Sequence, residues 1–384
     1  MTTPTPPPQT GLIPSLVGIR GLLAAIVVAV HMAPLAITLV PSAAPVWQVL
    51  WRSGYPALDV FFILSGYVVT TGYHRKFGRW PGWGTFGRFL LARLSRFYPV
   101  HLAVLAALVL AAVLGPQLGL SVPHRGTLGG DLPRALLLVH GWGGASSLTW
   151  NGPSWSLSAE WFCYLIFPLF MPLILRVRRP GAVLAGYLFA CAVPLVAYTW
   201  LGFEDAMITY RAPLFRAVGG FVAGAMLWRL GHVGSRIPTV LGRFTGALFL
   251  ATATVSVLLH LNGLPPLLVL PLAGLVVPAL AQRRGLFDAF LSTRPMLFAG
   301  ELSVPIYLTH VPWILAAGTV LTPARFPGAW GWAAIALCVL GALVVAYATL
   351  VLIERPGQVL LRRLGRPRPR ASSAPHVVNA AQAT

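Results

Sequence analysis

The sequence predicts an all-α protein, a polytopic transmembrane helical bundle of about ten spans with both termini in the cytoplasm. Of its 384 residues, 57% are hydrophobic and 9% are charged, and the mean hydropathy is +0.77. These values lie far outside the range of soluble domains. Apolar runs of about 20 residues, the length that crosses a bilayer, follow one another along the chain. The Lys and Arg residues stand in short clusters between the runs, which is how membrane topology is encoded.

Ten apolar runs have lengths that fit membrane spans. They cover 12–39, 57–73, 98–118, 155–175, 182–201, 214–230, 246–261, 266–281, 297–321 and 330–353. The seventh and eighth runs are short and close together, which favours a tight helical hairpin. The predicted organisation is a disordered N-terminal tail (1–11), a transmembrane domain (12–356) and a basic cytoplasmic tail (357–384) that is mostly disordered.

Charge sets the orientation of the predicted spans. With a cytoplasmic amino terminus, the cytoplasmic side receives 21 of the 28 Lys and Arg residues and Arg20 and Arg216 stay inside spans. The other side receives Arg52, Arg125, Arg134, Arg211 and Arg325. This asymmetry predicts a multi-pass protein of the inner or plasma membrane. Nucleic acid is excluded as a partner, because the basic residues do not gather on one solvated face.

Neither a metal site nor a disulfide is predicted. The three cysteines, Cys163, Cys191 and Cys338, all lie in apolar runs, and their spacing matches neither kind of site. They are interpreted as packing residues.

Seven ionisable residues stand in the apolar runs, where such groups are costly unless they face a bundle interior or water. They are Arg20, His31, Asp59, Glu160, Arg216, Glu301 and His310. Asp59 stands near the end of its run, so that an interfacial position is one interpretation and a functional role the other. Arg216 is expected either to neutralise a buried carboxylate or to serve the reaction. Glu301 is interpreted as a solvated residue at the start of its run.

His31 and Glu160 form the candidate catalytic pair. Eleven residues separate Arg20 from His31, about 16 Å of helix, so His31 is expected in the outer half of the first span. Glu160 is expected at a comparable depth, little more than one turn into the fourth span. A histidine held by a carboxylate in a dry bundle is a general base. The alternative is structural, with both groups only holding helices together.

Six segments together resemble the membrane-bound acyltransferase 3 family, whose members acylate sugars, lipids and macrolide-type natural products. They are GIRGLLAAIVVAVH (18–31), DVFFILSGY (59–67), RLSRFYP (93–99), NGPSWSLSAEWFCYLIFP (151–168), SVPIYLTHVP (303–312) and IERP (353–356). The segments stand in family order over nearly the whole membrane portion. The chain departs from the family pattern at Tyr67, Ala159, Trp161 and Pro305, none of which is a proposed catalytic group.

The resemblance implies acyl-CoA, most often acetyl-CoA, as a co-substrate, with no bound cofactor. Guanidinium groups bind phosphate by paired, charge-assisted hydrogen bonds. Arg93 and Arg96, expected on one side of a helix start at the cytoplasmic mouth, are therefore candidate ligands for the nucleotide end. The alternative is that these arginines only set topology. The pantetheine arm is expected to pass Ser65 and Gly66, where a glycine permits close approach.

In the implied reaction His31, oriented by Glu160, takes a proton from an acceptor hydroxyl as the hydroxyl attacks the thioester. Arg20, Ser65 or Tyr307 are candidates for steadying the donor or the developing oxyanion. Transfer through a covalent acyl-histidine is an open variant.

The predicted function is therefore an integral membrane O-acyltransferase that acts on a hydroxyl of a carbohydrate, glycolipid or natural product. His310 is a further candidate for substrate binding, with a structural hydrogen bond near Pro312 as the alternative. The competing class is a proton- or ion-coupled transporter or flippase, in which buried Arg, His and Glu couple solute movement. The sequence does not show the paired, broken helices that are frequent in such folds.

Overall fold

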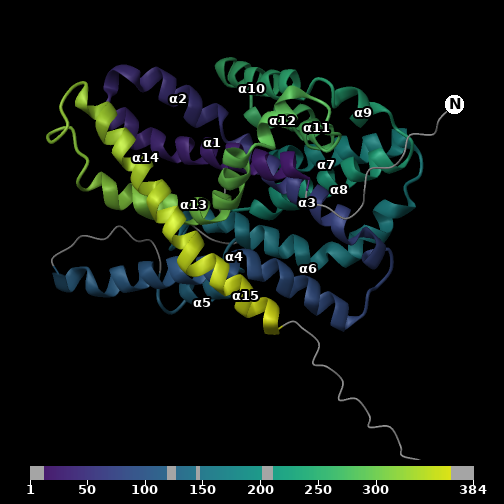
Figure 1. Ribbon diagram of the computed structural model, residues 1–384, viewed down its shortest axis with the longest axis horizontal. Coiled ribbons are helices and arrows are strands. Elements are labelled where there is room, and N and C mark those ends of the chain that lie inside the picture. Colours follow the sequence, from purple (N-terminus) through teal and green to yellow (C-terminus); the bar gives the residue numbers. More distant parts are fainter. Residues whose placement is uncertain (1–12, 119–126, 144–147, 201–210, 365–384) are drawn as a thin grey trace, which may run out of the picture.

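The computed structural model of the chain describes residues 13–118, 127–143, 148–200 and 211–364. Over these residues the chain folds into helices and loops, with no strand (Figure 1). The helices are α1 (Pro14–Leu39), α2 (Ala44–Ser53), α3 (Pro56–Phe77), α4 (Trp83–Leu114), α5 (Asp131–Leu136), α6 (Trp155–Arg176), α7 (Pro180–Trp200), α8 (Pro213–His232), α9 (Ile237–Leu241), α10 (Thr245–Leu261), α11 (Leu270–Leu280), α12 (Leu286–Leu291), α13 (Arg294–Gly318), α14 (Trp330–Thr349) and α15 (Arg355–Leu364). Short 3₁₀ turns are η1 (Pro41–Ala43), η2 (Pro116–Leu118), η3 (Gly152–Ser154) and η4 (Pro266–Val269), and η5 (Leu350–Glu354) is a π-helical turn.

A helix occupies each of the ten apolar runs that the sequence predicts as spans. Within the described residues, five helical segments are long and apolar enough to cross a membrane: Pro14–Leu39, Trp83–Leu114, Gly152–Arg176, Pro180–Ala197 and Trp330–Leu361. The protein is therefore a helical membrane protein, and the count of about ten spans stays a prediction. The interior helices α3, α8 and α13 are not in this apolar group. Each carries buried polar side chains and glycines on the faces that meet other helices.

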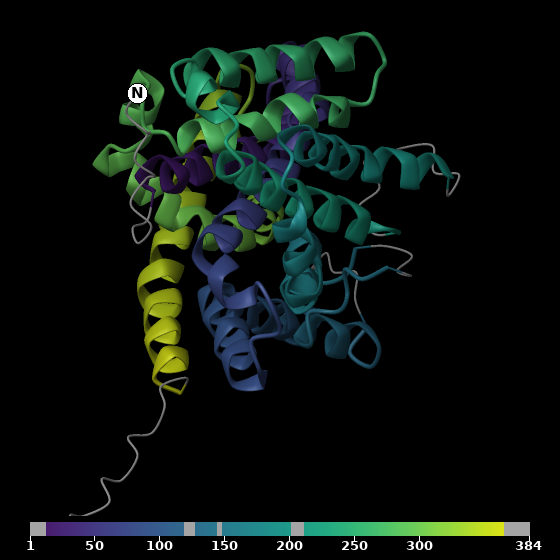
Figure 2. The same cartoon turned by 90° about the vertical axis from the view of Figure 1, so that its right-hand side faces the viewer.

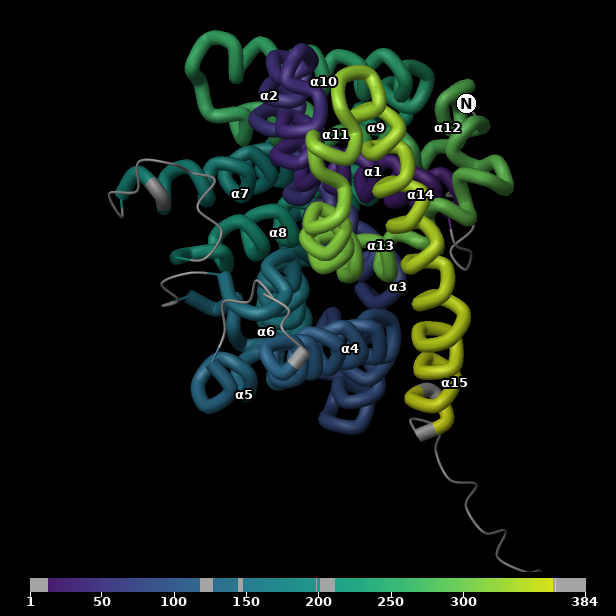
Figure 3. Tube along the Cα trace, turned by 90° about the vertical axis from the view of Figure 1, so that its left-hand side faces the viewer, coloured from purple at the N-terminus to yellow at the C-terminus, as the bar shows by residue number. Residues whose placement is uncertain are grey.

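The helices form three groups in space. Helices α4, α5 and α6 lie at one end, α2, α10 and α11 lie at the other, and α1, α3, α8 and α13 lie between them (Figures 1 and 2). Helix α14 and its continuation α15 run as one long rod along the side of the bundle, with α15 beside α4 (Figure 3). The central group therefore packs against both of the outer groups.

Small residues bring α1 and α13 close together. A methyl group added at Gly21 would collide with Ala299 and Gly300, and one added at Gly300 would collide with the backbone of Val17. Stripes of small residues of this kind let helix backbones approach within a membrane. Ten residues further along both helices, His31 meets His310, so the two helices run in the same direction.

The α3–α8 contact is also built on glycine. Gly220 packs on Asp59 and Phe62, and Gly224 packs on the backbone of Ile63. The residue numbers rise together, so these two helices are parallel. A parallel α1–α13 pair and a parallel α3–α8 pair are what an alternating ten-span topology requires, and the cytoplasmic position of the termini stays a prediction.

Two helix boundaries differ from the expected ones. Helix α4 begins at Trp83, so Arg93 and Arg96 lie well inside a helix and not at its start. At the other end of the chain, α15 continues the helix to Leu364, so the first part of the expected disordered tail is helical. The tails 1–11 and 366–384 lie outside the described residues.

Candidate active site

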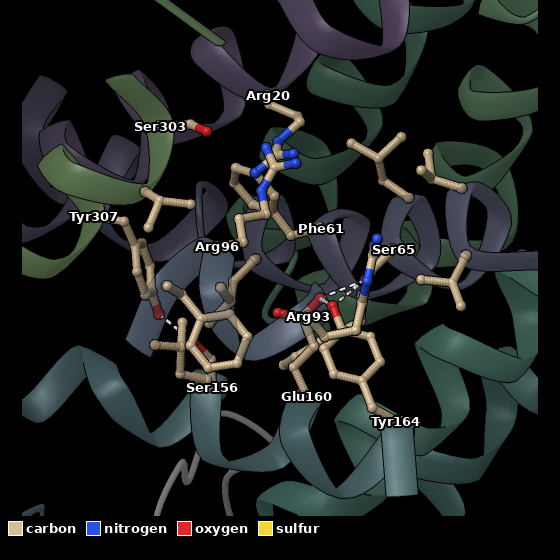
Figure 4. A pocket seen from close by; sticks show the side chains of 18 residues that line it. Arg20, Phe61, Ser65, Arg93, Arg96, Ser156, Glu160, Tyr164, Ser303 and Tyr307 are labelled. Atoms are coloured by element: carbon tan, nitrogen blue, oxygen red, sulfur yellow. Dashed lines mark hydrogen bonds between the residues drawn. The ribbon is translucent and has the colours of Figure 1, made fainter. Parts of the chain in front are cut away.

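A central cavity of about 120 Å³ lies between α1, α3, α4, α6 and α13. Polar side chains from all five helices line it: Arg20, Ser65, Arg93, Arg96, Ser156, Glu160, Tyr164, Ser303 and Tyr307. Figure 4 shows the three arginines directed into the same space as Ser65 and Glu160. Apolar side chains, including Phe61 and Phe97, form the rest of the wall. The structure thus gathers most of the residues that the sequence proposes for donor binding.

The arginines reach the cavity from two helices. Arg93 and Arg96 are three positions apart on α4 and therefore share one helix face. Their Nε atoms are buried and have no hydrogen-bond partner among the described residues. The Arg93 guanidinium also lies over the Tyr73 ring, 5.4 Å from its centroid. Buried arginines with unused donors, in a cavity with a single carboxylate, favour an anionic ligand.

The Glu160 carboxylate is held by hydroxyl groups. Its Oε1 accepts a hydrogen bond from the Ser65 hydroxyl and another, at 2.5 Å, from Tyr164 Oη. Ser65 Oγ and Tyr164 Oη are also within 3.2 Å of each other. The result is a closed polar cluster that joins α3 to α6 beside Arg93.

A second cavity contains His31, and we call it the histidine cavity. Its walls are mainly apolar and aromatic, with Tyr55, Leu58, Trp155 and Tyr307 among them. Leu58 and Tyr307 line both this cavity and the central one. The two cavities are therefore neighbours, and these two side chains stand at the boundary between them.

The expected contact between His31 and Glu160 is not formed. The ring of His31 is fixed by a hydrogen bond of its Nδ1 to the Val27 carbonyl oxygen, 2.9 Å away, and Glu160 is bound to Ser65 and Tyr164. The ring of His31 instead meets that of His310 edge-on, with centroids 4.9 Å apart. The Val27 carbonyl oxygen therefore fixes the orientation of the His31 ring, a role that the sequence predicted for the Glu160 carboxylate.

Gly66 does not line the central cavity. Consecutive helical residues point about 100° apart, so Ser65 faces the cavity and Gly66 faces α8. A methyl group at Gly66 would collide with the Phe221 carbonyl. The glycine of the SGY segment therefore sets helix packing and not donor approach.

Tyr307 and the Leu308 carbonyl of α13 are hydrogen-bonded to the segment that precedes α6. Tyr307 Oη donates to the Pro153 carbonyl oxygen at 2.9 Å and lies 2.6 Å from Ser156 Oγ. Pro312 has no N–H to give the Leu308 carbonyl, and the Asn151 side chain donates to that oxygen at 2.8 Å. Asn151 is thus a site residue that the sequence analysis missed, although the proline four positions after Leu308 is the signal for an orphaned carbonyl.

A third cavity, which we call the entrance cavity, lies on the other side of the central one. It shares Arg20, Val68 and Arg96 with the central cavity. Its remaining polar side chains are Thr71, Glu301, Glu354, Arg355 and Gln358. Glu354 belongs to the π-helical turn and to the IERP segment, and its Oε2 is buried without a partner among the described residues.

Two other sequence expectations have a clear outcome. Asp59 and Arg216 form a fully buried ion pair, with Arg216 Nε and Nη2 donating to the two carboxylate oxygens at 2.9 and 2.6 Å. This confirms that Arg216 neutralises a buried carboxylate. Glu301 is 55% exposed and pairs with Arg355 at 3.1 Å, which confirms that it is solvated, although it lies about two turns inside α13 and not at the start of the helix.

A helical membrane protein with adjoining cavities, one lined by three arginines and one lined by His31, has the architecture of an enzyme or transporter of the bilayer. Residues 13–351 match the acyltransferase domain of the acyltransferase 3 family. The chain therefore belongs to this family, as its six motifs predict, and is an O-acyltransferase by class.

Three relatives are informative. The chain is 29% identical to the acyltransferase MdmB of Streptomyces mycarofaciens, over 96% of both chains. It is 23% identical to the peptidoglycan O-acetyltransferase OatA of Listeria monocytogenes, over 83% of this chain and 52% of that one. A putative peptidoglycan O-acetyltransferase of Bacillus subtilis, YrhL, is also 23% identical, over 79% and 50%. The chain thus spans about half the length of the two peptidoglycan enzymes. No solved structure matches it.

Proposed function

We propose that this protein takes an acyl group, most simply acetyl, from acyl-CoA and transfers it to a hydroxyl of a carbohydrate, glycolipid or natural product. The observation that carries the proposal is the series of three adjoining cavities. Arg20 and Arg96 line both the entrance and the central cavity, Tyr307 lines both the central and the histidine cavity, and His31 lines the histidine cavity. We further propose that the protein lies in the inner or plasma membrane, with both termini in the cytoplasm.

Charge in the central cavity supports a phosphate-bearing donor. Arg20, Arg93 and Arg96 face one acidic residue, Glu160, so the lining has an excess of two positive charges when all four are ionised. The diphosphate of coenzyme A is an anion that guanidinium groups bind in paired fashion. Its nucleotide end would enter through the entrance cavity, and the pantetheine arm would extend towards Tyr307.

The reaction is proposed to take place where the central and histidine cavities meet. His31 Nδ1 points its hydrogen at a carbonyl, so Nε2 carries the lone pair that acts as a base. It takes the proton of the acceptor hydroxyl as the hydroxyl oxygen attacks the thioester carbonyl, and coenzyme A leaves as the thiol. Arg20, Ser65 and Tyr307 are proposed to hold the donor. Glu160 has a new role in this scheme, because it fixes Ser65 and offsets the arginines.

The lining of the histidine cavity bears on the acceptor. Apart from His31 and Tyr307, its side chains are apolar or aromatic, including Val27, Val30, Leu148 and Trp155. Such walls suit an acceptor that presents its hydroxyl on an apolar body or from within the bilayer.

The test is transfer by the purified protein in detergent. The protein is incubated with radiolabelled acetyl-CoA and a panel of glycolipid, oligosaccharide and polyol acceptors, and labelled ester is separated from unused donor. Labelled product that depends on Arg93 and Arg96 is the expected result. A transporter or flippase would give no product in detergent and would need a sealed membrane.

A further inference from the structure

The paired histidines of α1 and α13 have matching, fixed tautomers. His310 Nδ1 lies 3.0 Å from the Ile306 carbonyl oxygen, four residues earlier, as His31 Nδ1 lies beside that of Val27. A carbonyl oxygen only accepts, so each Nδ1 carries the hydrogen and each Nε2 carries a lone pair. Neither ring has a hydrogen to offer the other in this state.

His310 is the more enclosed of the two rings. It is fully buried, and its Nε2 has no hydrogen-bond partner among the described residues. An unsatisfied acceptor at such a position costs free energy, and a packing role would be served as well by an apolar residue of the same size. The lone pair of His310 Nε2 therefore suggests a function, and the acyl-transfer scheme above assigns none to it.

The helices place this acceptor beside the proposed base. The small-residue contact of Gly21 with Gly300 fixes the α1–α13 register, and the ring contact of His31 with His310 lies about 15 Å further along both helices. The rings meet edge to face at 4.9 Å and 71°. Asn151 braces the same turn of α13 through the Leu308 carbonyl.

We propose that His310 is a positioning residue that stabilises the protonated form of His31 during transfer. The inference rests on the proposed function. When His31 Nε2 takes the proton of the acceptor hydroxyl, the positive charge of the imidazolium lies next to the neutral His310 ring, whose centroid is 4.9 Å away and whose Nε2 keeps its lone pair. The new C–O bond forms as the C–S bond breaks, and the proton then passes from His31 to the leaving thiolate. His310 ends the cycle as it began, neutral, with its proton on Nδ1.

The test compares two substitutions of His310 that differ in hydrogen-bonding capacity. His310→Gln keeps an acceptor, whereas His310→Leu offers only apolar atoms. Because His310 acts through the base and does not touch the donor, His310→Leu is expected to lower kcat by about 10- to 100-fold, the range found for groups that orient metal-bound histidines, with the KM for acyl-CoA unchanged. His310→Gln is expected to recover at least part of this loss.

Three controls make the outcome decisive. Each variant is assayed per amount of folded protein, from its monodisperse peak on size-exclusion chromatography. His74→Leu removes a histidine with the same bond to a carbonyl four residues earlier, on α3 and outside the three cavities, and should leave kcat unchanged. In a His31→Ala background, His310→Leu should have no further effect.

The outcomes separate the two proposals. Equal kcat values for wild type and His310→Leu, or equal losses in His310→Leu and His310→Gln, would overturn the role of His310 alone. A wild-type protein that transfers no acyl group would overturn the proposed function, and this inference with it.

Discussion

Removal of one partner from the buried ion pair between Asp59 and Arg216 is predicted to destabilise the protein strongly. Both side chains are almost fully enclosed, at 1% and 0% exposure, and two hydrogen bonds join them. The guanidinium also lies 5.2 Å from the centroid of the Trp155 ring, part of the wall of the histidine cavity. Asp59→Asn keeps the shape of the side chain and removes its charge, which leaves a buried cation without its counter-ion. The expected loss is about 3–5 kcal/mol.

The assay is reversible unfolding of the purified protein in mixed micelles, followed by circular dichroism as the fraction of denaturing detergent rises. The Glu301–Arg355 pair is the matched control, because its side chains are 55% and 56% exposed. Glu301→Gln should therefore change the free energy of unfolding by less than about 1 kcal/mol. The double substitution Asp59→Leu with Arg216→Met should recover most of the loss, since it removes both charges. A change below about 1 kcal/mol for Asp59→Asn would show that Arg216 does not need its counter-ion.

Two further predictions concern packing and the donor. Gly66→Ala should greatly lower the yield of monodisperse protein, because its methyl would meet the backbone of α8, whereas Gly72→Ala, with open space around its Cα, should leave the yield unchanged. Arg93→Ala and Arg96→Ala should each raise the KM for acyl-CoA about tenfold or more, the effect of losing one charged hydrogen bond. Arg236→Ala, at an exposed position outside the three cavities, should leave that KM unchanged. An unchanged KM in the Arg93 and Arg96 variants would mean that these arginines set membrane topology only.

The positions of the helices follow from the sequence because lipid leaves the backbone few choices. A segment without water must satisfy its own N–H and C=O groups, so each apolar run of sufficient length becomes a helix. The early start of α4 is harder to predict, because its first turns are not continuously apolar.

The site is only partly predictable for a different reason. Arg20, Ser65 and Tyr307 fall where motif resemblance puts them, on the wall of one cavity. Which side chain lies beside His31 depends on how each helix is rotated about its axis, and the sequence does not reveal this rotation. Any histidine in a helix can instead donate a hydrogen bond to the carbonyl oxygen four residues earlier. His31 makes this bond to the Val27 carbonyl oxygen, and the Glu160 carboxylate accepts a hydrogen bond from the Ser65 hydroxyl instead.

The proposed mechanism depends most on His31 as the base of the acyl transfer. The most direct measurement is the kcat for acetyl transfer by purified His31→Ala, compared with wild type and with His74→Ala, together with equilibrium binding of acetyl-CoA to all three proteins. If His31 is the base, kcat should fall by at least about 100-fold in His31→Ala, donor binding should be unchanged, and His74→Ala should turn over normally. Turnover within a few-fold of wild type in His31→Ala would contradict this role.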